Sequence, residues 1–95
     1  MLYMVVENFR NGDPAAVGER FQRDGRMLPD GLVYRASWME SSGARCYQLM
    51  ETEVPELLRV WMKRWDDLVD FEVAQVMPAP DFWALRPPRA AGRTT

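Results

Sequence analysis

The sequence contains no histidine, which removes the side chain most often used as a general base and as a metal ligand. Ser-His and Cys-His nucleophile pairs are excluded with it. The chain has one cysteine, Cys46, so neither an intrachain disulfide nor a zinc site built from cysteines can form within one chain. We therefore expect no cofactor and no metal site, and the sequence identifies no catalytic residue.

Long apolar runs and a surplus of one charge are also missing. No window approaches the roughly 18 uninterrupted apolar residues of a membrane-spanning helix. The first residues have a strand-like pattern and lack the charged region and cleavage site of a signal peptide. The net charge is −2, from 12 basic and 14 acidic residues, which favours neither nucleic acid nor an anionic membrane as a partner. We predict a soluble cytoplasmic protein.

The composition is that of one folded domain. The chain has 95 residues, of which 47% are hydrophobic, enough for a core but a thin one. Alternation, helical spacing and turn residues divide most of it into six elements: a strand at 2–9, a helix at 14–24, strands at 32–40 and 45–52, a helix at 55–67 and a strand at 68–77.

The helix at 55–67 has the strongest pattern of the six elements. Pro55 suits the first helical position, and apolar residues recur at helical spacing on one face, namely Leu58, Trp61, Trp65 and Leu68. The tryptophans of this face are therefore expected in the core. The helix at 14–24 is weaker because Gly18 interrupts it, although Asp13 and Pro14 form a good start.

The order of these elements is strand, helix, strand, strand, helix, strand. This order is typical of the split βαβ or ferredoxin-like fold, an α+β architecture in which two helices cover one face of a four-stranded antiparallel sheet. We assign residues 1–78 to this domain. Residues 79–95 are expected to form a tail containing proline and arginine, disordered from about residue 87.

The stretch "LYMVVENF" at 2–9 raises the question of what covers the second face of the sheet. Both of its alternating sets are apolar, with Leu2, Met4 and Val6 on one side and Tyr3, Val5 and Phe9 on the other. Left open, such a face exceeds what a monomer usually exposes. We predict that a second copy covers it, so that two sheets form a dimeric α/β barrel. The alternative is that the tail folds back with Phe82 and Trp83.

Polar residues on the predicted strands form a candidate ligand pocket. If the barrel interior takes the more polar side of each strand, the pocket residues are Asn8, Arg35, Ser37, Cys46 and Gln48, with Trp38 as a wall. The alternative is that these residues sit at the seam between two copies and only satisfy one another. Strict alternation places Val33, Arg35, Ser37 and Met39 on one side of their strand, without showing which side faces the helices.

Other reactive groups have simpler interpretations. Cys46 is expected to be a small buried apolar residue, because a reactive thiolate needs a nearby cation such as Arg35 or Arg45. Four strand carboxylates could offer a general base or, in pairs, metal ligands: Glu7, Glu51, Glu53 and Glu72. Glu51 and Glu53 have the spacing of residues on one side of a strand, but without histidine the four are better explained as solvated or arginine-paired strand ends.

Several segments together resemble a known group of proteins. These are "MLYMVVENF" followed by "GDP", then "GRMLPDGLVYRASW", "CYQLMET" and "DLVDFEVAQVM", which cover residues 1–78. The chain resembles small bacterial proteins catalogued only as a domain of unknown function, and similar to the dimeric α/β-barrel class. That class includes small monooxygenases and haem-degrading enzymes. The resemblance implies the fold and a homodimer, while the missing histidine argues against an axial haem ligand.

Two functions are compatible with these features. The first is binding of a small molecule inside a dimeric barrel, with monooxygenase-like chemistry that needs no cofactor. The second is a non-catalytic dimerisation or interaction module whose barrel interior is filled by side chains. The distinction between them is whether the folded protein contains a cavity lined by polar groups.

Overall fold

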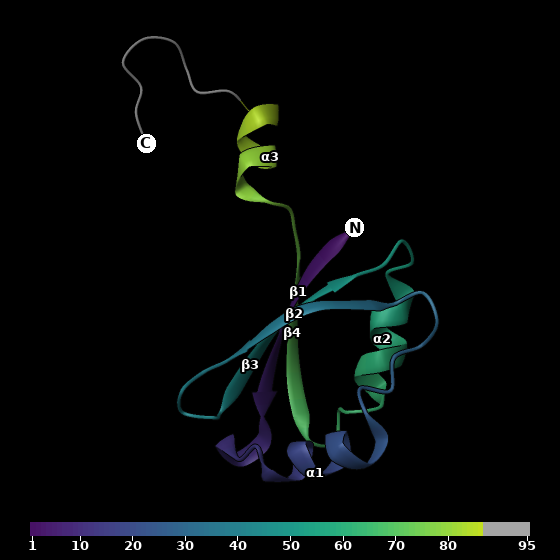
Figure 1. Cartoon of the computed structure of the whole chain (residues 1–95), viewed down its shortest axis with the longest axis vertical. Coiled ribbons are helices and arrows are strands. Elements are labelled where there is room, and N and C mark those ends of the chain that lie inside the picture. Colours follow the sequence, from purple (N-terminus) through teal and green to yellow (C-terminus); the bar gives the residue numbers. More distant parts are fainter. Residues whose placement is uncertain (87–95) are drawn as a thin grey trace.

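The computed structural model describes residues 1–86 and has the predicted order of elements (Figure 1). The elements are β1 (Leu2–Phe9), a 3-10 turn (Arg10–Gly12), α1 (Ala15–Asp24), β2 (Val33–Met39), β3 (Arg45–Glu51), α2 (Glu56–Lys63), β4 (Val69–Val76) and α3 (Ala79–Leu85). All strand pairs are antiparallel and the strand order is β2-β3-β1-β4. The α+β, ferredoxin-like prediction is confirmed. No helix within residues 1–86 is long and apolar enough to cross a membrane.

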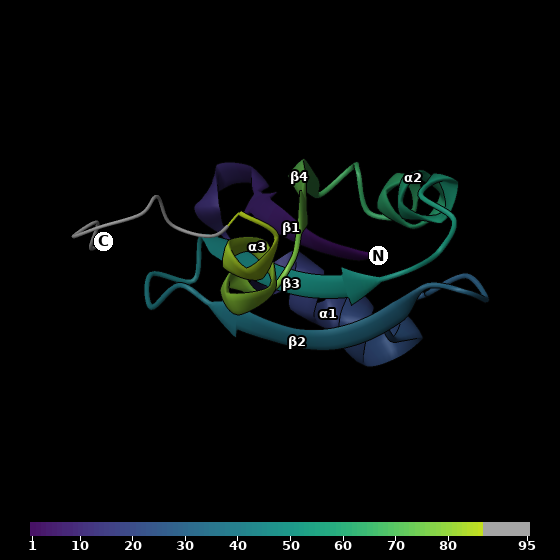
Figure 2. The ribbon, with the colours of Figure 1, turned by 90° about the horizontal axis from the view of Figure 1, so that it is seen from above.

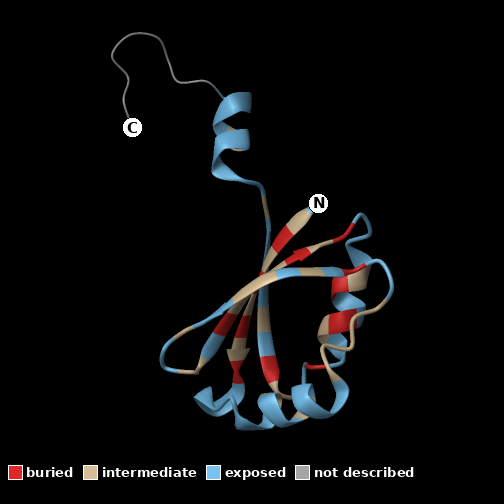
Figure 3. Cartoon of the chain, viewed as in Figure 1, coloured by how far each residue is buried: buried red, intermediate tan, exposed pale blue. Residues whose placement is uncertain are grey.

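The two faces of the sheet differ in burial, as the alternation along the central strand β1 shows. Tyr3, Val5, Glu7 and Phe9 are buried, and the residues between them are only partly buried, as the alternating bands of β1 in Figure 3 show. Side chains of α1 and α2 lie over the buried face together with those of β1, β2 and β3. Both helices therefore cover the same side of the sheet. The other side, the open face, carries Leu2, Met4 and Val6 from β1.

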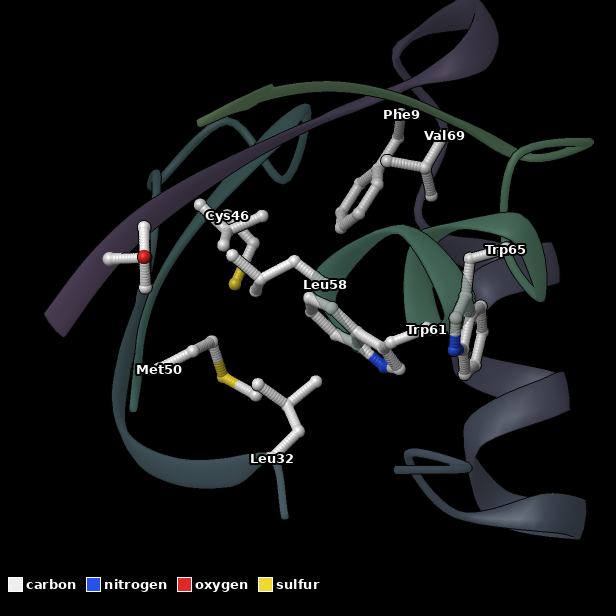
Figure 4. Packing of buried hydrophobic residues seen from close by; sticks show 10 residues of the cluster. Phe9, Leu32, Cys46, Met50, Leu58, Trp61, Trp65 and Val69 are labelled. Atoms are coloured by element: carbon white, nitrogen blue, oxygen red, sulfur yellow. The ribbon is translucent and has the colours of Figure 1, made fainter. Parts of the chain in front are cut away.

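Helix α2 supplies most of the helical part of the core. Leu58 and Trp61 are buried on its inner face, and Trp65 is buried just beyond its end (Figure 4). The helix ends at Lys63, four residues earlier than predicted. Tight turns replace its last turn, with the backbone N–H groups of Leu68 and Val69 donating to the Trp65 carbonyl. The chain thus reverses into β4 while the Trp65 side chain still faces the core.

The loop between α1 and β2 is bound to α2 through backbone carbonyls. The Trp61 and Trp65 indole N–H groups both donate to the carbonyl oxygen of Arg26, at 2.9 and 3.0 Å. Arg64 donates to the carbonyl of Met27. The loop also has an unusual backbone, because Met27 adopts a φ of 58°, which non-glycine residues rarely take. These hydrogen bonds offset the strain and determine where Arg26 lies.

Helix α1 is held mainly by polar contacts of its side chains. None of its side chains is fully buried. Arg20 donates to both carboxylate oxygens of Asp67, at 2.8 and 2.7 Å, and also to the Arg64 carbonyl. At its start, the Ala15 backbone N–H donates to Asp13, as expected for a residue that begins a helix. Exposed ion pairs contribute little, so α1 is the more weakly held of the two helices that cover the sheet.

Strand β2 departs from the strict alternation predicted for it. The pairing with β3 shifts between Tyr34 and Ala36, so Arg35 forms a bulge. The prediction that Arg35 and Ser37 lie on the same side is therefore wrong. The bulge instead brings Tyr34 and Ser37 to one side, where their hydroxyl groups are 2.8 Å apart.

The segment after β4 was assigned from the sequence to the C-terminal tail, but it forms a helix. Pro78 and Pro80 follow the end of the sheet, where proline is expected, and both also suit the first turn of α3. Helix α3 stands clear of the sheet, beyond the end of β4 (Figures 1 and 2). Phe82 and Trp83 pack edge to face on each other and do not cover the open face. The disorder expected from about residue 87 lies outside the described residues.

Replacing Trp61 with alanine tests the packing. Trp61 is 1% exposed, and the change removes both its packing and its bond to the Arg26 carbonyl. We expect a loss of about 3–5 kcal/mol in the free energy of unfolding, measured by urea denaturation. Trp83→Ala is the matched control, because Trp83 is 55% exposed on α3 and its loss should cost less than about 0.5 kcal/mol. Equal losses would contradict the described core.

Candidate functional site

A cavity of about 240 Å³ lies between the buried face of the sheet and the helices α1 and α2. Its walls are apolar and largely aromatic, with Phe9 from β1 and Trp61 and Trp65 from α2 and the turn after it. Helix α1 closes a third side with residues on one face, including Gly18 and Phe21. Figure 4 shows Phe9, Trp61 and Trp65 around the same interior region. The cavity therefore lies on the helix side of the sheet, away from the open face.

The floor of the cavity is polar because of the strand register. Glu7 on β1 pairs with Cys46 on β3, and Gln48 on β3 pairs with Ser37 on β2. These four side chains lie in two adjacent rows across the sheet and all line the cavity. A few polar groups within an apolar wall are typical of small-molecule sites.

Glu7 and Gln48 form a buried hydrogen-bonded pair at the centre of the floor. The Gln48 amide Nε2 donates to Glu7 Oε2 at 2.6 Å, and each residue is 7% exposed. Burial raises the pKa of the Glu7 carboxyl, while the bond from Gln48 and the nearby charge of Arg26 act in the opposite direction. The amide oxygen of Gln48 is buried and has no hydrogen-bond partner among the described residues. The pair is thus rich in acceptors.

Arg26 lies at the side of the cavity, on the loop that α2 holds. Its guanidinium carbon is 3.6 Å from the ring centre of Tyr34 and 5.1 Å from that of Phe21. Both rings offer their faces to the cation, which holds the side chain in place. Arg26 also lines the cavity and is the cation that influences Glu7 and Cys46. It therefore balances the charge of Glu7 across the site.

Cys46 has the properties of an inert thiol. It is 7% exposed, and burial first and then the Glu7 carboxylate raise its pKa to about 11, against the influence of Arg26. Arg35 and Arg45, the two cations considered from the sequence, pair instead with Glu51 and Glu40. At neutral pH the thiol stays protonated, so Cys46 contributes size and weak polarity to the cavity floor.

The structure brings together three of the six residues predicted for a pocket, but on the helix side of the sheet and not on the open face that would form the interior of the predicted barrel. Ser37, Cys46 and Gln48 line the cavity. The other three, Asn8, Arg35 and Trp38, lie away from it. Asn8 donates to Glu72 and to the Asp70 carbonyl, Arg35 pairs with Glu51, and Trp38 is 55% exposed and pairs with Tyr47 on the open face.

Glu7 and Arg26 belong to the site but were not selected from the sequence as pocket residues. Glu7 could have been selected from the sequence, because a carboxylate that alternates with Tyr3, Val5 and Phe9 must point to the same buried face. No sequence pattern indicated Arg26, since its position depends on a loop backbone that only the folded chain defines.

The remaining carboxylates form no metal site in the described chain. Within residues 1–86, no group of three or more acidic or cysteine side chains is placed to hold a metal ion. Glu51 pairs with Arg35, and Glu53 accepts a hydrogen bond from the N-terminal ammonium group at 2.8 Å. Both interactions explain these residues as strand-end ion pairs.

Comparison with known proteins places the chain in one family. It matches DUF3303, described as a domain of unknown function, over residues 1–88, so the chain belongs to this family. The match extends past residue 78, where the resemblance recognised in the sequence ended, and includes α3. No curated protein and no solved structure matches the chain.

The buried carboxylate should make stability depend on pH. Because the pKa of Glu7 is raised above its ordinary value of 4.5 in the folded protein, its contribution falls as pH rises from that value through the folded pKa. We expect Glu7→Gln to gain stability relative to the wild type between pH 4 and pH 8, measured by urea unfolding at each pH.

Glu53 provides a control of opposite sign for this measurement. The N-terminal ammonium group lowers the pKa of Glu53 below its ordinary value of 4.5, so the contribution of this pair grows as pH rises toward 4.5. Glu53→Gln should therefore lose stability relative to the wild type as pH rises only at this acidic end of the titration. A Glu7→Gln difference that stays constant with pH would show that Glu7 does not carry a raised pKa in the folded state.

Proposed function

We propose that this protein binds a small molecule in the cavity between its sheet and its helices. The observation that supports this most is an apolar cavity whose floor carries a buried Glu7–Gln48 pair. An apolar cavity of about 150 Å³ is known to accept benzene. A volume of about 240 Å³ therefore suits a ligand of one or two rings. A chain that served only to dimerise would gain stability by filling this space.

Cofactor-free monooxygenation is the second candidate, and it uses the same cavity. Such chemistry begins when a base removes a proton from an acidic substrate, which then reacts with oxygen itself. Glu7 is the one carboxylate among the described residues that line the cavity, and its raised pKa suits a general base. Binding is the step common to both candidates, so it is tested first.

We further propose that two copies associate through the open face of the sheet. This face combines partly buried Leu2, Met4, Val6 and Leu49 with Val33 and Trp38, which are 47% and 55% exposed. Helix α3 leaves this face uncovered (Figure 1). A self-complementary apolar face of this kind favours an isologous dimer. We take the cytoplasm as its setting, because the only cysteine is a free thiol.

A charge at the centre of the open face tests the dimer. Leu49 pairs with Met4 on one side and Ala36 on the other. We expect the wild type to sediment as a dimer and Leu49→Asp to sediment as a monomer with an unchanged circular dichroism spectrum, because burial of an unpaired charge is unfavourable. Val60→Asp, on the exposed side of α2, is the control and should remain dimeric. A monomeric wild type would contradict the proposal.

Filling the cavity from α1 tests ligand binding. Gly18 lines the cavity, and a Cβ there would meet no atom within 4 Å. Gly18→Leu should fill the space, whereas Gly18→Ala should leave most of it and strengthen the helix by about 1 kcal/mol. With benzofuran as the probe, we expect the indole N–H resonances of Trp61 and Trp65 to shift in the wild type and in Gly18→Ala, and not in Gly18→Leu.

The other tryptophans act as internal controls in this NMR experiment. Trp38 and Trp83 lie outside the cavity, so their indole resonances should stay in place. Shifts at all four tryptophans would indicate nonspecific association. The absence of any shift at millimolar benzofuran would contradict the proposed site.

A further inference from the structure

We infer that the ligand is a flat, uncharged aromatic molecule with a hydrogen-bond donor, and that Glu7 accepts this donor while Gln48 holds the carboxylate in position. This inference rests on the proposed binding function and specifies its ligand. Three features carry it: the excess of acceptors on the floor, the aromatic walls, and the balance of charge between Glu7 and Arg26.

The floor has more acceptors than the protein itself satisfies. Within the described residues, Glu7 accepts one hydrogen bond, through Oε2, and its second oxygen has no donor. The Gln48 amide oxygen is buried without a partner. The Ser37 hydroxyl is already engaged with Tyr34. A buried acceptor left unpaired, such as the Gln48 oxygen, is costly, so a ligand that brings an N–H or O–H recovers that cost on binding. The second oxygen of Glu7 is not fully buried, and it offers the ligand a charged acceptor beside the Gln48 oxygen.

The walls select the shape of the ligand. Four aromatic side chains surround the floor, Phe9, Phe21, Trp61 and Trp65, and they come from β1, α1, α2 and the following turn. The Trp61 and Trp65 nitrogens are both occupied by the Arg26 carbonyl, so these two indoles offer only apolar surface to the ligand. A planar ring fits against such surfaces better than a branched chain does.

The charges on either side of the cavity disfavour an ionic ligand. The Glu7 carboxylate attracts a cation and the Arg26 guanidinium, held by Tyr34 and Phe21, attracts an anion, but each attraction is offset by repulsion from the other group. Together the two groups are neutral. A neutral ligand leaves this balance intact, and its donor is directed to Glu7 because Arg26 has no acceptor.

Indole and benzofuran form a matched pair of probes for this inference. They have nearly the same shape, but only indole carries an N–H. A hydrogen bond to a charged acceptor should make indole bind about ten- to a hundredfold tighter than benzofuran to the wild type, measured by NMR titration of the Trp61 and Trp65 indole resonances.

Variants of Glu7 assign the preference to this residue. Glu7→Leu should lose the preference for indole over benzofuran, measured as the ratio of the two dissociation constants. Glu7→Gln keeps a neutral acceptor and should retain a smaller preference, so it also serves if the leucine variant does not fold. Glu72→Leu is the control, because Glu72 lies on β4 with its side chain bonded to Asn8, outside the cavity. It should keep the full preference.

The outcomes separate this inference from the function on which it rests. If neither probe binds, the cavity is not a binding site and the proposed function fails. If both bind equally, the cavity stands and recognition of a donor is overturned. If indole is still preferred in Glu7→Leu, the donor is received elsewhere and the role of Glu7 is overturned.

Discussion

One carbonyl oxygen, that of Arg26, organises the part of the molecule that carries the cavity. It accepts from the indoles of Trp61 and Trp65, which lie one helical turn apart, and so joins the loop after α1 to α2. The bond fixes the two rings as a wall. It also sets the direction from which the Arg26 side chain reaches Tyr34 and Phe21. The aromatic walls of the cavity and the position of the Arg26 charge thus both depend on the hydrogen bonds to this one carbonyl.

The arrangement explains why a polar floor is tolerated inside a small domain. Glu7 and Gln48 are almost fully buried, which is unfavourable unless each is satisfied. Their mutual bond and the nearby Arg26 offset part of that cost, and the rest remains as unused acceptor capacity. Gly18 has a similar character, since glycine weakens α1 but leaves space beside the floor. The chain gives up stability at the positions that shape the cavity.

The order of elements could be predicted from the sequence because each element carries its own periodic pattern. The apolar face of Leu58, Trp61 and Trp65 and the alternation in β1 were sufficient for the ferredoxin-like topology. The site was only half predictable. Ser37 reaches the cavity floor because of a bulge at Arg35, and no local sequence pattern indicates such a bulge. Helix α3 was missed because Pro78 and Pro80 signal the end of a strand as well as the start of a helix.

The shared acceptor also determines how the loop after α1 opens. A carbonyl held by two indoles cannot turn away from one without disturbing the other, so the loop is released from both in a single step. The Arg64 bond to Met27 adds to the same barrier. The loop is therefore expected to open as a cooperative unit rather than by gradual fraying. Hydrogen exchange of the loop amides would then report this single opening, because two indoles hold the same Arg26 peptide.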